Sequence, residues 1–311
     1  MTIDVIIPVR NGELFISECL DSVLNQSAIT HFSRIIVIDD GSEDNTAGIV
    51  EGYVKQGLGV DLHSTGQRGL SAARNYGLRL STAENVAFLD SDDLWLPHKL
   101  ESHLDHLEKH SSCFFSFTLA SEFRSNSDLA KLQGLNRENP TFNSMLLQEF
   151  RIYGSGSSVF VDRALARSEG GFDEEMKFGE DWDFWLKLAQ RQLPCQLSET
   201  ATLIRIHPLS MQRTKRVGDE RFLNSSVHFQ EWAKYPQIFQ DSRFRSVAFK
   251  IMWADFRKNF GVREIFSTDY CNFLFANHGS VLYKMRLRRN RLFNLILIFH
   301  RLIREFPGVG H

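Results

Sequence analysis

Short apolar runs alternate with amphipathic stretches along the first 110 residues of this chain. Four apolar runs predict buried strands, of which the third is the weakest: residues 3–8, 34–38, 59–63 and 85–90. Apolar positions at helical spacing predict helices in residues 16–24, in 42–56 with Ser42 as N-cap, in 70–78, and in a stretch that starts with Leu94 to Pro97. This alternation predicts an α/β fold, a mostly parallel sheet flanked by helices.

Beyond residue 110 the pattern is less regular. Strands are predicted in residues 113–119, 157–162 and 201–206, whereas residues 121–139 are polar, lack periodicity and predict a loop. A helix is predicted to begin after Gly179, with acidic side chains at Glu180, Asp181 and Asp183 in its first turn. Acidic residues also stabilise helix N-termini without any chemistry, so this turn alone does not establish a site.

Polar side chains gather where the predicted strands end. Arg10 and Asn11 follow the first strand, Asp39 and Asp40 end the second, and residues 90–93 place three carboxylates among four residues. The carboxyl ends of parallel strands share one edge of the sheet, so we expect these three clusters to meet in one crevice. Carboxylate oxygens suit Mg²⁺ or Mn²⁺, although Asp is also common in ordinary turns.

Composition narrows the classes of function. The net charge of -2 gives no electrostatic case for nucleic acid as a partner. The four cysteines show no paired spacing, and the apolar surroundings of two of them predict buried thiols in a reducing compartment: Cys19 and Cys113 (the others are Cys195 and Cys271). The chain goes straight into its first predicted strand, so we expect no signal peptide, and no apolar run approaches the ~20 residues of a membrane span. We therefore expect a cytoplasmic protein, with peripheral contact at the inner membrane face as the alternative.

The last third of the chain has a different composition. Residues 216–311 are rich in Phe and Arg, contain few glycines and predict helices. Residues 283–304 form a basic amphipathic pattern, which is typical of helices that lie on anionic membranes. The same apolar positions would equally serve to pack the segment on the preceding domain while the arginines stay solvated. The sequence leaves both alternatives open.

Four motifs together carry a family resemblance. They read Val5-Ile-Ile-Pro-Val-Arg-Asn, Ile36-Val-Ile-Asp-Asp-Gly-Ser-Glu-Asp-Asn-Thr, Arg68-Gly-Leu-Ser-Ala-Ala-Arg-Asn-Tyr-Gly and Val86-Ala-Phe-Leu-Asp-Ser-Asp-Asp-Leu-Trp-Leu-Pro. Residues 3–97 thereby resemble the nucleotide-binding half of a family 2 inverting glycosyltransferase of the GT-A fold. Gly170-Gly-Phe-Asp, Gly179-Glu-Asp-Trp-Asp-Phe-Trp-Leu and Ile204-Arg-Ile-His-Pro-Leu-Ser-Met resemble its acceptor side and closing strand.

The resemblance implies a domain organisation and a reaction. Residues 1–215 would form the GT-A catalytic domain, with 1–110 as the nucleotide-binding half and 111–215 as the acceptor half, followed by a helical C-terminal region at 216–311. The enzyme would move a sugar from a nucleotide sugar, a UDP-sugar by expectation, to a hydroxyl of a saccharide or lipid-linked saccharide in surface polysaccharide or glycoconjugate synthesis. A divalent metal, Mn²⁺ or Mg²⁺, would assist.

The same resemblance assigns residues to roles. Nucleotide binding would involve Pro8, Val9, Arg10, Asn11, Asp39, Asp40, Arg74, Asp90 and Ser91, with Asp40 accepting from the base and Asp39 as an alternative that spacing leaves open. Asp92 matches the direct metal ligand, and His207 a position that completes the metal or contacts the diphosphate. Asp181 matches the general base that removes the acceptor proton.

Several alternatives compete with this interpretation. Absence of a Gln-x-x-Arg-Trp motif favours addition of single sugars over polymer extrusion. An inactive relative that only binds a sugar nucleotide would keep the fold without the chemistry. A sugar-1-phosphate nucleotidyltransferase would carry a Gly-rich basic loop after the first strand, where Pro8-Val-Arg-Asn-Gly-Glu fits poorly, and a dehydrogenase would carry G-x-G-x-x-G.

Overall fold

The computed structural model describes residues 1–28, 31–124, 129–133, 139–176 and 179–208 of the first part of the chain, and residues 228, 231–232, 234–244 and 247 further on. The chain divides into two compact units, Met1–Ser210 and Met211–His311. Among the described residues, no helix has both the length and the apolar character that crossing a bilayer requires. Residues 283–304, with their basic pattern, lie outside the described residues.

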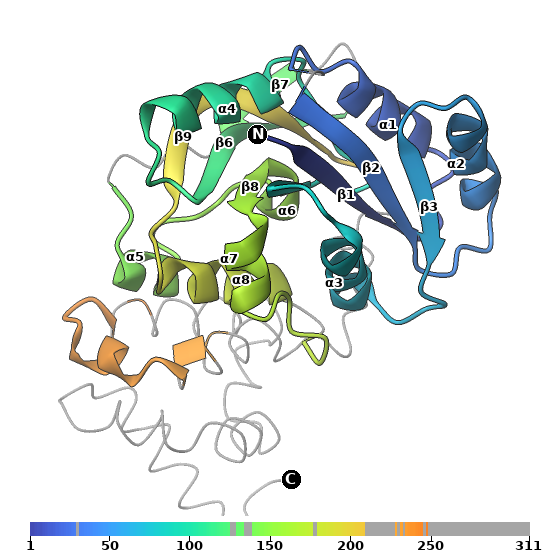
Figure 1. The fold of residues 1–311 in the computed structure, drawn as a ribbon. Coiled ribbons are helices and arrows are strands. Elements are labelled where there is room, and N and C mark those ends of the chain that lie inside the picture. The colour runs from blue at the N-terminus through green and yellow to red at the C-terminus, as the bar shows by residue number, and fades with distance from the viewer. Residues whose placement is uncertain are drawn as a thin grey trace, which may run out of the picture. The chain divides into compact units, whose positions relative to one another are not determined.

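One nine-stranded mixed sheet organises the first unit (Figure 1). Its order is β3 (Val60–Ser64), β2 (Phe32–Asp39), β1 (Ile3–Val9), β4 (Asn85–Phe88), β8 (Val159–Asp162), β6 (Phe115–Phe123), β9 (Cys195–Arg205) and β5 (Leu94–Trp95), and β7 (Leu129–Gln133) pairs with β6. Strands β3, β2, β1 and β4 run parallel to one another. Strand β8 is antiparallel to both β4 and β6. The predicted α/β fold with a mostly parallel, helix-flanked sheet is confirmed for this unit.

Helices cover both faces of the sheet. The helices are α1 (Ile16–Leu24), α2 (Thr46–Lys55), α3 (Leu70–Leu80), α4 (Lys99–Lys109), α5 (Phe142–Leu146), α6 (Ser155–Ser158), α7 (Arg163–Ser168) and α8 (Glu180–Ala189). One face of β1 and β2 packs in a single buried cluster with α1, α2 and α4. On the other face, Ile36 and Ile38 of β2 contact Ala73 of α3. The alternation of buried side chains along the strands therefore assigns each helix to a face.

Small residues set how closely α3 approaches the sheet. A Cβ on Gly77 would lie only 2.5 Å from Cγ2 of Ile6, so glycine is required for this contact. Further along the same face, the rings of Phe88 and Phe172 meet edge-on at 5.2 Å between centroids, and Trp185 of α8 lies 6.4 Å from Phe88. The aromatic cluster holds α8 beneath β4, and so brings a helix from the second half of the unit to the first.

The structure corrects several sequence-based boundaries. Leu94–Trp95 is a short strand paired antiparallel with β9, and the helix begins at Lys99. Ser42 does not cap α2, whose N-cap is Asn45. The Ser42 hydroxyl donates instead to Asp39. Residues 121–123 continue β6 and Leu129–Gln133 is a strand, because the polar stretch pairs at a sheet edge that its composition did not reveal.

The redox state predicted for the cysteines is confirmed for Cys19 and wrong for Cys113. Cys19 is a buried free thiol, as expected, and burial together with the carboxylates of Asp93, Asp92 and Asp90 raises its pKa well above the usual value. Cys113, predicted to be a thiol, forms a disulfide with Cys195, which lies 82 residues away in sequence. The partner could not be identified from spacing, since β6 and β9 become neighbours only in the folded sheet.

The described residues of the second unit contain a short 3-10 helix, Pro236–Gln240. Trp232 is fully buried, and its ring meets that of Phe244 edge-on at 4.9 Å. Lys234 pairs with Glu231 at 2.8 Å. The predicted helical character of residues 216–311 otherwise falls outside the described residues.

Candidate active site

The loops after β1 and β2 are joined by hydrogen bonds. Asn11 has a left-handed backbone with φ of 52°, which Asn tolerates better than most residues. Its N–H donates to the Ser42 hydroxyl at 2.9 Å, and its side-chain oxygen accepts from the N–H of Glu43 at 2.8 Å. The ends of β1 and β2 therefore form one rigid rim, as the parallel arrangement predicted.

Two adjacent carboxylates at the end of β2 have different partners. Both oxygens of Asp40 accept hydrogen bonds from the loop before α3: Oδ1 from the Thr65 hydroxyl and the N–H of Arg68, and Oδ2 from the N–H of Gly69. Asp39 accepts from the N–H and hydroxyl of Ser42 through Oδ1. Asp40 thus holds the β3–α3 loop in place, whereas Asp39 holds the start of the loop that follows β2.

Arg74 links the end of β4 to the start of α8. It is only 2% exposed, donates to Oδ1 of Asp90 at 2.7 Å and to Oε1 of Glu180 at 3.1 Å, and stacks over the ring of Phe172. Desolvation opposes the charge of this guanidinium, but the carboxylates of Asp90 and Glu180 more than compensate and raise its pKa. Residues more than one hundred positions apart in sequence are thereby fixed side by side.

Asp92 meets His207 at the same edge. Nε2 of His207 donates to Oδ2 of Asp92 at 2.9 Å, and the ring of His207 lies 4.5 Å from that of Phe15. Arg205 donates to the backbone oxygen of Asp92 at 2.8 Å and also pairs with Glu18. Carboxylate oxygens suit Mg²⁺ and Mn²⁺, and Asp92 brings one to this edge. The residues therefore fit the predicted cation.

A buried network lies beneath these carboxylates. Asp93 is 5% exposed; its Oδ2 accepts from the Ser157 hydroxyl at 2.6 Å and its Oδ1 from the N–H of Arg205 at 3.0 Å. The same hydroxyl accepts from the N–H of Asp90 at 3.0 Å. Asp93 thus ties together the ends of β4 and β9 and the short helix α6, and it fixes the backbone that presents Asp90 and Asp92.

Asp181 lies in the first turn of α8, directly after Glu180. The helix begins behind Gly179, whose φ of 74° is a left-handed conformation that glycine adopts without strain. The carboxylate of Asp181 is half-buried, and its Oδ1 accepts from the N–H of Trp182 at 2.7 Å. Because Glu180 bonds Arg74, and Arg74 bonds Asp90, Asp181 lies at the same edge of the sheet as the β4 carboxylates.

Several of these acids hold protons more tightly than usual. Burial raises the pKa of Asp92, the charge of Asp90 raises it further, and the hydrogen bond from His207 works in the opposite direction. Burial and then the neighbouring Asp92 and Asp90 raise the pKa of Asp93 well above its usual range. The pKa of Glu180 is raised by burial and by Asp181, against the attraction of Arg74. Excess negative charge is therefore concentrated here, and a bound cation would relieve it.

The remaining predicted residues line the same edge. Pro8 and Val9 end β1 and pair with Ile38 and Asp39 of β2, and Arg10 follows them in an exposed position. Ser91 is half-buried, and a Cβ on Gly12 would lie 3.5 Å from its hydroxyl oxygen, so the β1 loop lies close to the β4 end. The predicted site residues thus lie in or directly beside one rim, and their roles stay predictions.

Sequence reasoning assigned no role to four residues of this arrangement: Glu180, Asp93, Ser157 and Arg205. Three of them had a signal, since Asp93 is the third carboxylate of residues 90–93, Glu180 precedes the predicted base and Arg205 lies within the Ile204-Arg-Ile-His motif. Ser157 had none, because nothing in a strand-like stretch indicates that its hydroxyl contacts a carboxylate 64 residues earlier. Such partners become visible only once β8 is placed beside β4.

Comparison with known proteins gives the family. Residues 4–165 match the model of "Glycosyl transferase family 2". An uncharacterized glycosyltransferase of Rickettsia bellii is 30% identical over 207 residues, covering 66% of this chain and 29% of that protein. A chondroitin synthase of Escherichia coli is 30% identical over 193 residues, covering 60% of this chain and 26% of that protein. The chain therefore spans less than a third of the length of either relative.

Solved structures share the fold. S. aureus TarS 1-349 in complex with UDP-GlcNAc superposes with a TM-score of 0.68 at 19% identity, covering 98% of this chain and 92% of that chain. The mannosyltransferase PcManGT from Pyrobaculum calidifontis, in complex with GDP-Man and Mn²⁺, has a TM-score of 0.54 at 17% identity and covers 98% of this chain and 87% of its own. At these identities the likeness establishes the architecture only.

Proposed function

The chain belongs to glycosyl transferase family 2, and we propose that it transfers a single sugar, with inversion, from a nucleotide sugar to a hydroxyl of a saccharide or lipid-linked saccharide. One observation carries the proposal: Arg74 bonds both Asp90 of the β4 end and Glu180 of α8. This bridge brings the acids suited to a cation-bound diphosphate to the same edge as Asp181, an acid suited to act on an attacking alcohol.

The proposed halves of the site have separate tasks. We assign residues 1–110 to the nucleotide and residues 111–215 to the acceptor. The β1 and β2 ends would hold the base and ribose, with Asp39 as the acceptor of a hydrogen bond from the base because Asp40 already accepts three from the β3–α3 loop. A UDP-sugar is the proposed donor, since a structural neighbour was solved with UDP-GlcNAc.

Asp92 and His207 would hold Mn²⁺ or Mg²⁺, and a structural neighbour was solved with Mn²⁺. When bound, the cation stabilises the negative charge that develops on the departing diphosphate. The residues around it keep the donor oriented: Asp93 fixes the backbone of the β4 end, and Arg74 holds Asp90. Rigid positioning of this kind lowers the entropic cost of reaching the transition state.

Asp181 would act as general base. Its carboxylate takes the proton of the acceptor hydroxyl while the oxygen attacks the anomeric carbon and the bond to the diphosphate breaks. The products are the glycosylated acceptor, the nucleoside diphosphate and one proton. One base, without a second carboxylate acting as nucleophile, leads to inversion in a single displacement.

A donor screen tests the proposal directly. Thermal unfolding of the full chain is followed with UDP-, GDP- and dTDP-sugars, each with and without Mn²⁺, and we expect one nucleotide class to stabilise only when the cation is present. Release of the nucleoside diphosphate with that donor then demonstrates turnover. Binding without any release would support an inactive relative, and release of pyrophosphate from a nucleoside triphosphate and a sugar phosphate would support a nucleotidyltransferase.

We propose surface polysaccharide or glycoconjugate synthesis in the cytoplasm as the setting, with peripheral contact at the inner membrane face through residues 283–304. The proposal rests on the basic amphipathic sequence and on the chondroitin synthase relative. Sedimentation with anionic liposomes compares the full chain with a truncation to residues 1–280. Loss of binding in the truncated chain supports the membrane role, and equal binding removes it.

A further inference from the structure

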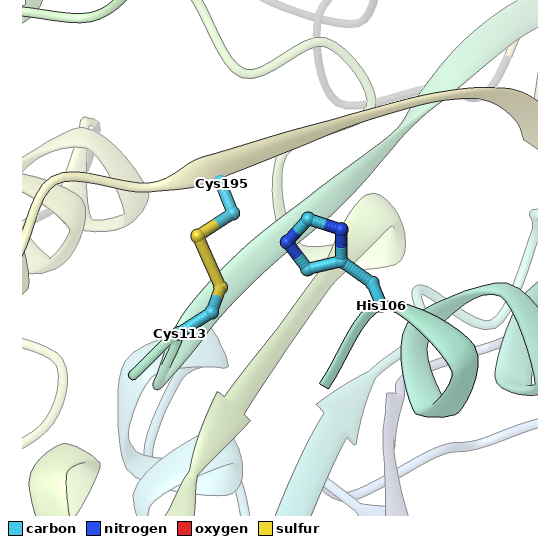
Figure 2. A group of neighbouring side chains, drawn as sticks. All are labelled: His106, Cys113 and Cys195. Atoms are coloured by element: carbon cyan, nitrogen blue, oxygen red, sulfur yellow. A yellow bond between two sulfur atoms is a disulfide. The ribbon is translucent and has the colours of Figure 1, made fainter. Parts of the chain in front are cut away.

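A second group of side chains with ligand chemistry lies apart from the rim of carboxylates. His106 comes from the last turn of α4, Cys113 from the segment before β6, and Cys195 is the first residue of β9. Their ligand atoms, one from each residue, lie within 4.8 Å of one another. Figure 2 shows a ring nitrogen of His106 directed toward the disulfide that joins the two cysteines.

The imidazole at this group is incompletely satisfied. Nε2 of His106 is buried and accepts or donates no hydrogen bond among the residues that the structure describes. A buried polar atom without a partner destabilises the folded state, so its retention calls for an explanation. Disulfide sulfur is a weak acceptor and does not provide one.

A cavity of about 380 Å³ opens beside the same three side chains. Its lining also includes His110, Asn139 and Gln196, and the ring of His110 lies 4.5 Å from that of His106. A small solute therefore has room to reach the sulfurs and the imidazole. The lining includes imidazole, sulfur and amide groups as well as apolar side chains, and among the residues that the structure describes it contains no carboxylate, in contrast to the β4 end.

We propose that, once the Cys113–Cys195 disulfide is reduced, the two thiolates and Nε2 of His106 bind one Zn²⁺, with the fourth coordination position facing the cavity. Two cysteines and one histidine are a common zinc ligand set, and soft sulfur donors select Zn²⁺ over Mg²⁺ or Mn²⁺. Metal binding would also give the unpartnered imidazole nitrogen the bond that it lacks.

Reduction of the disulfide precedes zinc binding. A dithiol reductant delivers two electrons and two protons to the disulfide, yielding two protein thiols, and is itself oxidised to a disulfide. Zn²⁺ then displaces the two thiol protons as two Zn–S bonds and one Zn–N bond form. Reoxidation of the thiols to the disulfide removes both sulfur ligands, so zinc and disulfide exclude each other.

Cobalt absorption tests the site in the full-length protein. Reduced, metal-free protein is titrated with Co²⁺, and we expect thiolate-to-cobalt charge-transfer bands at one equivalent that Zn²⁺ abolishes, whereas the disulfide form shows no bands. Cys113→Ser and Cys195→Ser should each weaken binding by more than the ~10–100-fold that loss of an outer-sphere partner costs. Absence of the bands in the reduced wild type overturns the proposal.

Matched variants assign the ligands. His106→Gln should weaken Zn²⁺ binding, whereas His110→Gln, one turn further along and lining the same cavity, should leave it unchanged; equal losses would overturn the assignment of His106. Asp92→Asn must keep the cobalt bands, which separates this site from the cation site proposed for catalysis.

If the cysteine variants fail to fold, the wild type supplies an independent measurement. Alkylation of the reduced protein is followed by mass spectrometry with and without Zn²⁺. We expect zinc to protect Cys113 and Cys195 from modification, with buried Cys19 as the internal control. Equal modification of both cysteines with and without zinc would mean that the disulfide is a structural cross-link only.

Discussion

The end of β4 and the first turn of α8 both carry adjacent carboxylates, yet their surroundings differ. At β4, side chains from three other elements hold the acids: Arg74 bonds Asp90, His207 bonds Asp92, and Ser157 bonds Asp93. At α8, Glu180 bonds Arg74, whereas the half-buried Asp181 accepts from the backbone N–H that follows it.

A carboxylate that holds a metal ion and a carboxylate that acts as a general base need different surroundings. Carboxylates that position a cation benefit from fixed partners, because coordination tolerates little displacement. A general base needs an accessible carboxylate near the attacking hydroxyl. We propose the first use for the β4 end and the second for Asp181, so variants at the two places should fail in different ways.

The largest expected effect is on the chemistry at α8. Asp181→Asn removes the base while keeping the shape of the side chain, and we expect the rate of sugar transfer to fall about 10²–10⁴-fold. Transfer to a saturating acceptor is measured by release of the nucleoside diphosphate. Glu175→Gln, an exposed carboxylate in the loop before α8, is the control and should retain the wild-type rate. A wild-type rate for Asp181→Asn would remove the base from this residue.

Breaking the bridge between the two regions should cost stability. Arg74→Gln leaves the carboxylates of Asp90 and Glu180 without the buried guanidinium that pairs with them. We expect a loss of about 3–5 kcal/mol in the free energy of unfolding. Urea denaturation measures it. Arg79→Gln on the same helix removes an exposed pair with Glu174 at 3.9 Å and should change stability by less than about 0.5 kcal/mol. Similar losses for the two variants would show that the bridge is not structural.

A variant at the proposed metal ligand Asp92 should weaken binding of the nucleotide. Asp92→Asn removes a carboxylate ligand, and we expect the Mn²⁺-dependent affinity for the nucleotide to fall by at least about tenfold. Calorimetric titration of the nucleotide at several Mn²⁺ concentrations measures this affinity, and excess Mn²⁺ should restore part of it. Asp105→Asn, an exposed acid on α4, provides the control. An unchanged affinity in Asp92→Asn would place the cation elsewhere.

The last prediction concerns the pH dependence of stability. Asp93 has a raised pKa in the folded protein, so the folded state binds its proton more tightly than the unfolded state does. The contribution of this group to stability is therefore complete below about pH 4 and is lost as the pH rises through the raised pKa, by up to about 1.4 kcal/mol per pH unit. Asp93→Asn should flatten this dependence in urea denaturation between about pH 4 and pH 7. Parallel curves would show that Asp93 does not cause it.

The predictable part of the fold is the part with local signals. Apolar runs located β1, β2 and β4, and the acidic turn after Gly179 located the start of α8 at Glu180. The rim followed from parallel strand order, because strands joined by helices place their carboxyl ends at one edge.

The unpredictable part depends on contacts between distant segments. The Cys113–Cys195 disulfide, the pairing of β7 with β6 and the contact of Ser157 with Asp93 all join segments whose adjacency is decided by sheet order in the second half of the unit. Composition and periodicity carry no information on that order, since β8 runs antiparallel and β5 is only two residues long.

The central claim is that acids at the end of β4 hold the leaving side of the donor while Asp181 acts on the acceptor. Calorimetric titration of Asp181→Asn with the nucleoside diphosphate and Mn²⁺ tests it most directly. We expect wild-type affinity in this variant, whose transfer is lost. An affinity that falls together with transfer would contradict it, because Asp181 would then support the binding site and not the proton transfer.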